Sequence, residues 1–169
     1  KTKMGSDIVY INSRIKERSA KFYVQLDKMP AIFGLSKWQS DNGAAPPKLS
    51  IDLSFRNKDE HKKQASFLNF LSNLDNVVIN TGRVNYLGGE KSLEVAKELY
   101  KKSVKTSEGY APTVKVAVTP NTKLYNSRKQ ELEMSEENIP KGAILDVIMS
   151  ISSIWIINKK SFGISIRAE

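Results

Sequence analysis

The stretch GAILDVIMSISSIWIINKKSFGISIRA, from Gly142 to Ala168, holds the densest run of apolar, β-forming side chains in the chain. Through residues 145–151 a large apolar side chain occupies every second position, which is the period of a β-strand. The adjacent serines Ser152-Ser153 predict a β-bulge, where one extra residue bends a strand. After a polar turn at residues 158–161 the alternation resumes from Phe162. The stretch therefore predicts a long bent strand and a returning hairpin partner, as in the wall of a small closed barrel.

Length and composition fit one globular domain. The chain has 169 residues, 40% of them hydrophobic, which suffices for a sizeable core. No apolar run approaches the ~20 residues of a membrane helix, and the N-terminus lacks a signal pattern, so we expect no membrane contact and an intracellular protein. Without cysteine, and with His61 as the single histidine, disulfides, thiolate metal sites and all-histidine zinc sites are excluded. We expect no cofactor.

The balance of charge is strongly basic. The formal net charge is +9 and the isoelectric point is about 9.6. Most of the excess lies within residues 1–106, whereas residues 107–169 are nearly balanced. Such a balance predicts attraction to a polyanion, most simply nucleic acid, and carries no information about the fold.

Hydrophobic periodicity predicts strands and helices in a recognisable order. Strands are expected at 8–11, 20–26, 48–56 and 113–118, with a break at Lys28-Met29-Pro30, a loop at 37–47 and a short strand at 77–79. Helices are expected from Asn57 to about Leu74 and from Glu90 to Val104. For residues 119–141 a hairpin excursion and a short helix remain open.

This order matches an oligonucleotide-binding (OB) barrel, in which a helix follows the third strand. The predicted fold class is α+β and mainly β: a five-stranded OB-fold-like barrel with one or two packed helices. We expect residues 1–7 to be a tail, and residues 8–169 to form a single nucleic-acid-binding domain.

Catalytic interpretations have little support, so we expect a protein that is not an enzyme and has no catalytic or metal-binding residues. The chain has no strand–GxxxxGK[ST]–helix phosphate loop. His61 lies in a run of charged residues on the solvent face of a predicted helix. A two-carboxylate nuclease site would need several aspartates to converge. Of these, Asp52 and Asp146 occupy solvent-facing strand positions, which suit solubility and edge protection better.

Binding to a single strand requires cations along a groove and aromatic faces on which bases stack, at ~1–3 kcal/mol per base. Tyr23 and Trp38 lie in polar surroundings that give burial no reason. Trp155 has the parity opposite to its neighbours Ile154 and Ile156, so it either joins the core or leaves it for the surface. The candidate nucleic-acid-binding residues are the cations Arg14, Lys16, Arg18, Lys21, Lys37, Arg56, Lys159, Lys160 and Arg167, and the aromatic residues Tyr23, Trp38 and Trp155.

The segment SSIWIINKKSFGISIRA, residues 152–168, resembles the last strands of single-stranded DNA-binding proteins of large nucleocytoplasmic DNA viruses and their phage relatives. In that family a Trp-containing strand is followed by a lysine turn and a Phe-Gly-Ile strand. YAPTVKVAVTP, residues 110–120, and KLSIDLSF, residues 48–55, with its following helix, are also similar. The resemblance implies an OB barrel that coats single-stranded DNA in replication, recombination or repair, without sequence preference, where viral DNA replicates in the infected cell.

Members of that family often carry an acidic C-terminal tail that recruits replication enzymes. The residues Arg167-Ala168-Glu169 do not form such a tail, so replication proteins are expected partners by resemblance alone. Three alternatives stay open: an RNA- or duplex-binding module, a scaffold for an acidic partner, and a magnesium-dependent nuclease built on Asp7, Asp27, Asp52 and Asp146. A homo-oligomer is compatible with each of these functions.

Overall fold

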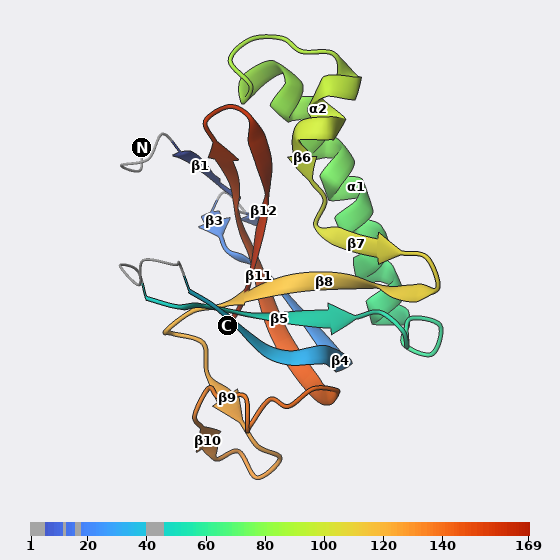
Figure 1. Cartoon of the computed structure of the whole chain (residues 1–169), viewed down its shortest axis with the longest axis vertical. Coiled ribbons are helices and arrows are strands. Elements are labelled where there is room, and N and C mark those ends of the chain that lie inside the picture. Colours follow the sequence, from blue (N-terminus) through green and yellow to red (C-terminus); the bar gives the residue numbers. More distant parts are fainter. Residues whose placement is uncertain (1–5, 12, 16–17, 40–45) are drawn as a thin grey trace.

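The computed structural model describes residues 6–11, 13–15, 18–39 and 46–169, with side chains for residues 7–11, 21–39 and 46–169 (Figure 1). The C-terminal hairpin predicted from the sequence is present. Strand β11 (Ala143–Ile157) pairs antiparallel with β12 (Ser161–Ala168), and Asn158 and Lys159 turn the chain with φ values of 50° and 57°. The register shifts between Ile151 and Ser153, so the predicted bulge at the two serines is confirmed.

Five strands, including the two of this hairpin, close into a barrel. The ring consists of β4 (Phe22–Trp38), β5 (Lys48–Ser54), β8 (Tyr110–Val118), β12 and β11, and β11 pairs back to β4. All neighbours are antiparallel except β8 and β12, which meet in parallel at a single pair, Ala117 with Arg167. This is the partly open Greek-key barrel of the OB-fold, so the predicted fold class is confirmed.

Strand β4 runs unbroken through the segment predicted to interrupt it. At Lys28, whose φ is 54°, the backbone N–H donates to Asp146 Oδ1 at 2.8 Å. At Gly34, whose φ is 70°, the chain turns again, and the next backbone N–H donates to the Ile139 carbonyl at 3.0 Å. The predicted break is therefore a pair of irregularities within one strand, which let it bend around the barrel. The predicted loop at 37–47 also begins later, because Lys37 and Trp38 still pair with β5.

Helix α1 (Lys62–Asn85) is longer than predicted and includes residues 77–79, which were expected to form a strand. Buried residues recur along it at helical spacing from Phe67 through Leu71 and Val78 to Gly82, and this packing overrides the β-propensity of the Val-Val-Ile triplet. Helix α2 (Leu93–Leu99) ends earlier than predicted. Neither helix in the described ranges is long and apolar enough to cross a membrane.

The remaining strands lie outside the ring. β1 (Ser6–Tyr10) pairs with β11, β2 (Ser13–Ile15) with β3 (Arg18–Ala20), β6 (Tyr100–Lys101) with β12, β7 (Val104–Ser107) with β8, and β9 (Leu124–Tyr125) with β10 (Glu131–Leu132). The β9–β10 hairpin settles the alternative left open for residues 119–141. The helices follow the strand at 48–54, as predicted, but because β1 is not a ring strand, this strand is the second of the ring and not the third (Figure 1).

Two apolar clusters hold the fold together. One fills the barrel, with Met29, Leu53 and Phe55 fully buried. The other lies between the helices and the β11–β12 hairpin and centres on Phe162, against which Gly82 of α1 packs so closely that a Cβ there would lie 2.4 Å from the Phe162 ring. Ile154 and Ile156 belong to this second cluster. The intervening Trp155 therefore points to the opposite face of β11.

Candidate nucleic-acid interface

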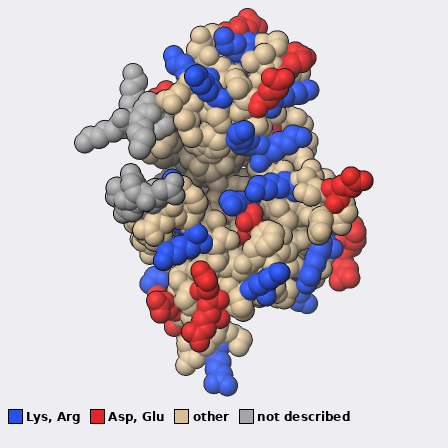
Figure 2. Space-filling model, viewed as in Figure 1, with Lys and Arg blue, Asp and Glu red and all other residues tan. Residues whose placement is uncertain are grey.

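A groove of about 690 Å³ lies on the outer face of the barrel, bordered by β5, β8, β12 and the β6–β7 segment. Both tryptophans of the chain line it, as do Ser50, Ile164 and Ser165, and no Asp or Glu of the described residues does. Its cations are Lys48, Lys101, Lys102, Lys105, Lys115 and Arg167. Figure 2 shows the face that carries β7 and β8, where Lys and Arg side chains gather around a central hollow.

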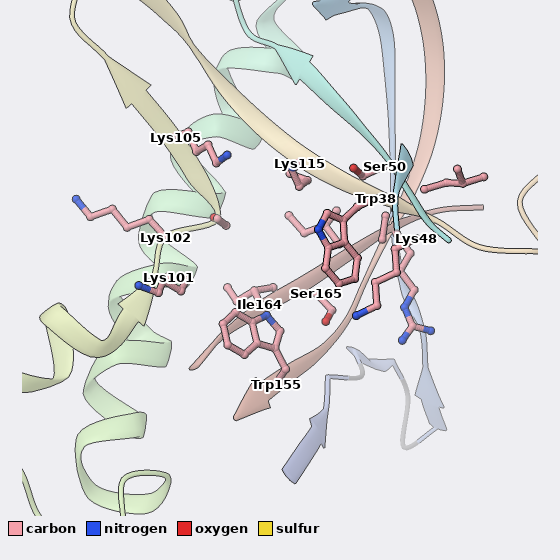
Figure 3. Close-up of a pocket in the computed structure, with 15 residues that line it drawn as sticks. Trp38, Lys48, Ser50, Lys101, Lys102, Lys105, Lys115, Trp155, Ile164 and Ser165 are labelled. Atoms are coloured by element: carbon pink, nitrogen blue, oxygen red, sulfur yellow. The ribbon is translucent and has the colours of Figure 1, made fainter. Parts of the chain in front are cut away.

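The two indoles enter this groove from different strands (Figure 3). Trp38, at the end of β4, is 59% exposed, and Lys48 Nζ lies 5.4 Å from its ring centroid, a cation–π contact. Trp155 is half-buried and lies across Gly163, its partner in the β11–β12 ladder. One indole thus projects into solvent, while the other rests on the sheet.

Because Gly163 has no side chain, the indole of Trp155 can lie directly over it. A Cβ at Gly163 would lie 2.6 Å from Trp155 Cζ2 and 3.0 Å from the Lys101 carbonyl oxygen, contacts that the indole cannot keep without moving. We expect Gly163→Ala, in a Trp38→Phe background, to shift the Trp155 emission maximum and to weaken several-fold any quenching of this emission by poly-dT. An unchanged emission spectrum together with unchanged quenching would show that the indole does not depend on Gly163.

A carboxylate lies beneath the cationic lining. Asp52 on β5 is only 5% exposed, and its Oδ2 is 3.6 Å from the Nζ of Lys115, its direct partner on β8. The expectation that Asp52 serves solubility or edge protection on the solvent side was wrong, because β5 is flanked by β4 and β8 and has no open edge. Asp52 instead neutralises part of the charge that Lys115 presents to the groove.

Removing this charge should strengthen the binding of an anionic ligand. We expect Asp52→Asn to raise the affinity for poly-dT a few-fold at low salt, because Lys115 then presents its full charge to the groove. Asp59→Asn is the control, because Asp59 is exposed and pairs with Lys58, outside the groove. A loss of affinity in Asp52→Asn, with the fold intact, would contradict this expectation.

The structure brings three of the sequence-predicted residues together in the groove: Trp38, Trp155 and Arg167. Lys37 has the opposite parity to Trp38 and lines a different hollow. Tyr23 is exposed and lies with Phe22, Phe70, Lys62 and Lys63 in a separate shallow depression. Four further predicted cations are exposed but do not line the groove: Lys21, Arg56, Lys159 and Lys160. Lys16 lies outside the described residues, and so do the side chains of Arg14 and Arg18.

Five groove cations were not among the predicted residues. Lys48 and Lys115 occupy outward positions of ring strands, so strand parity alone could have nominated them. Lys101, Lys102 and Lys105 follow α2 in a region expected to be helical, where parity could not place them. These three form one side of the groove (Figure 3).

Three of the four aspartates of the alternative nuclease hypothesis have other partners, and that of Asp52 is Lys115. Asp27 Oδ2 lies 3.8 Å from Lys63 Nζ, and Asp146 accepts the Lys28 N–H across the bulge in β4. Among the described residues, no three His, Cys, Asp or Glu side chains gather closely enough to hold a metal ion.

No protein-family profile matches the sequence, and no curated protein is significantly similar to it in sequence. Among solved structures, the chain is similar to the single-stranded DNA-binding protein of bacteriophage Enc34 in complex with ssDNA, with a TM-score of 0.52, 16% identity, and coverage of 86% of this chain and 82% of that one. A C-terminally truncated form of the phage protein gives a TM-score of 0.50, 16% identity, and coverage of 86% and 80%. At this identity the likeness concerns the fold. The resemblance to proteins of large nucleocytoplasmic viruses stays a prediction.

Proposed function

We propose that this protein binds single-stranded DNA without sequence preference and coats it during replication, recombination or repair of viral DNA. The observation that carries the proposal is the groove, in which both indoles and six cations converge. Cations hold phosphates, and indoles stack on any base, because every base has a π-face. A duplex offers phosphates but no open base faces, so this arrangement favours the single strand.

The likeness to a phage protein solved with ssDNA supports the same proposal. We extend the proposal to a role in binding rather than catalysis, at the site of viral DNA replication inside the infected cell and beside other replication proteins. The direct partner of the groove is the DNA strand itself.

The test is intrinsic tryptophan fluorescence during titration with a ~30-nucleotide poly-dT. An oligomer of this length is long enough to occupy several stacking sites. Because both tryptophans line the groove, quenching reports on that surface alone. If all six cations contact phosphates, the logarithm of affinity falls with the logarithm of salt at a slope of about −4, so raising salt from 50 to 200 mM weakens binding roughly 300-fold.

A duplex and an RNA oligomer of the same length provide the controls. Quenching that favours the DNA single strand supports the proposal. Equal binding to the duplex would indicate a module that recognises charge only, and equal binding to RNA would extend the ligand to single strands of either kind. The absence of any quenching at low salt would overturn the proposal.

A further inference from the structure

One buried carboxylate holds both ends of a short basic segment. Asp75, in the middle of α1, is only 6% exposed. Its Oδ1 accepts a hydrogen bond from the Tyr100 hydroxyl at 2.5 Å, and its Oδ2 accepts one from the Ser103 backbone N–H at 3.1 Å. Burial, and next the hydrogen bond to Asp75, raise the pKa of Tyr100, so the hydroxyl keeps the proton that it donates.

The two residues between these anchors are Lys101 and Lys102, and both line the groove. The segment is also held at its two ends, because β6 pairs with β12 at Tyr100 and Lys101, and Val104, directly after Ser103, pairs with Val114 of β8. The Tyr100 ring adds an edge contact to Phe162 at a centroid distance of 5.1 Å. The Tyr100 ring packs in the apolar cluster with Val78 and Ile79 of α1, and the bonds to Asp75 add the side-chain hydrogen bonds that join both ends of the segment to that helix.

We propose that Asp75 and Tyr100 are positioning residues for single-strand binding, which hold Lys101 and Lys102 in the groove although neither touches the ligand. This inference rests on the proposed function. A segment that is ordered before binding loses less conformational freedom when phosphates bind to it. Releasing it should weaken binding without removing a single cation.

The first test compares two tyrosines that both pack against Phe162. Tyr100→Phe removes the hydroxyl and keeps the ring; Tyr86→Phe removes the hydroxyl of a half-buried tyrosine whose ring lies 6.3 Å from that of Phe162 and which does not bond to Asp75. We expect Tyr100→Phe to lower the affinity for poly-dT about tenfold and Tyr86→Phe to leave it unchanged. Wild-type affinity in Tyr100→Phe would overturn the inference.

A second test separates positioning from general stability. In a Lys101→Ala/Lys102→Ala background, Tyr100→Phe should cause no further loss of affinity, because the side chains that it positions are gone. An equal tenfold loss in both backgrounds would mean that the hydroxyl acts through the fold as a whole, and would overturn the inference.

Hydrogen exchange keeps the test decisive if Tyr100→Phe lowers stability. We expect faster exchange at the Ser103 amide in this variant, with unchanged protection at Val114 and Val116 in the barrel. Uniform loss of protection would argue against a local role. Failure of the wild-type protein to bind poly-dT at all would instead refute the proposed function, so the two failures are distinguishable.

Discussion

Replacement of both Trp38 and Trp155 with alanine is expected to lower the affinity for single-stranded DNA about 100-fold or more. Each stacked base contributes ~1–3 kcal/mol, and each 1.4 kcal/mol is a factor of about ten in affinity. Trp38, which is 59% exposed, should lose little besides stacking. Trp155 also covers Gly163, so its removal uncovers part of the sheet.

Because the double variant has no tryptophan, its affinity is measured by the anisotropy of a labelled poly-dT. The slope of affinity against salt should stay near its wild-type value, since all six cations remain in place. Tyr125→Ala is the matched control, because Tyr125 is 55% exposed on β9, outside the groove. Wild-type affinity in the double variant would remove stacking from the mechanism.

The largest effect on stability is expected from Gly34→Ala. Gly34 has a φ of 70°, which costs an L-residue roughly 1–2 kcal/mol. A Cβ there would also lie 2.6 Å from the Ile139 carbonyl oxygen and 2.8 Å from the Pro140 carbonyl carbon. The backbones must separate, which breaks the hydrogen bond from Leu35 N–H to Ile139 and disturbs a fully buried isoleucine. We expect a total loss of about 3–4 kcal/mol.

A thermal melt measures this loss, which should lower Tm by roughly 10 °C for a chain of this size. Gly109→Ala is the control, because Gly109 has a φ of 74° and no atom within 4 Å of its added Cβ among the described residues. It carries the dihedral cost alone, so its Tm should fall by about a third as much. Equal falls in the two variants would show that the contact with Ile139 costs nothing.

The hairpin of β11 and β12 could be predicted because its signals are local. Alternation, the serine pair and the polar turn all lie within one short stretch. Strand β4 could not be predicted in the same way, because Lys28-Met29-Pro30 has the composition of a break. It continues as a strand because Asp146, on the neighbouring strand, bonds to the irregular backbone.

Helix α1 illustrates the opposite error. Val77, Val78 and Ile79 carry the β-branched side chains of a strand, but Val78 and Ile79 fit the apolar stripe that begins with Phe67. A helix prediction that stops near Leu74 misses the part that packs on Phe162. Asp75 lies directly after the predicted end of this helix, and its hydrogen-bond partners lie more than 20 residues further along the chain. No sequence signal therefore singled it out.

In the candidate site too, the residues with local sequence signals could be predicted, and those placed by tertiary contacts could not. Parity on a long strand nominated Trp155 and Arg167, and polar context nominated Trp38, because these signals need no knowledge of tertiary packing. The cations of the β6–β7 segment could not be found, since their position depends on where α2 ends and on a hydrogen bond from Tyr100 to α1. Tyr23 shows the limit of parity: it faces outward as predicted, but over a different part of the surface.

The single parallel pair that joins β8 to β12 has a mechanical consequence. A fold opens locally where its contacts are fewest, so the barrel is expected to open first between β8 and β12. The two residues of this pair, Ala117 and Arg167, both lie in the groove. A DNA strand in the groove would bridge β8 and β12 by contacting Lys115 on β8 and Arg167 on β12. The barrel would then be stiffer when loaded than when empty, and its wall would resist opening most while it covers DNA.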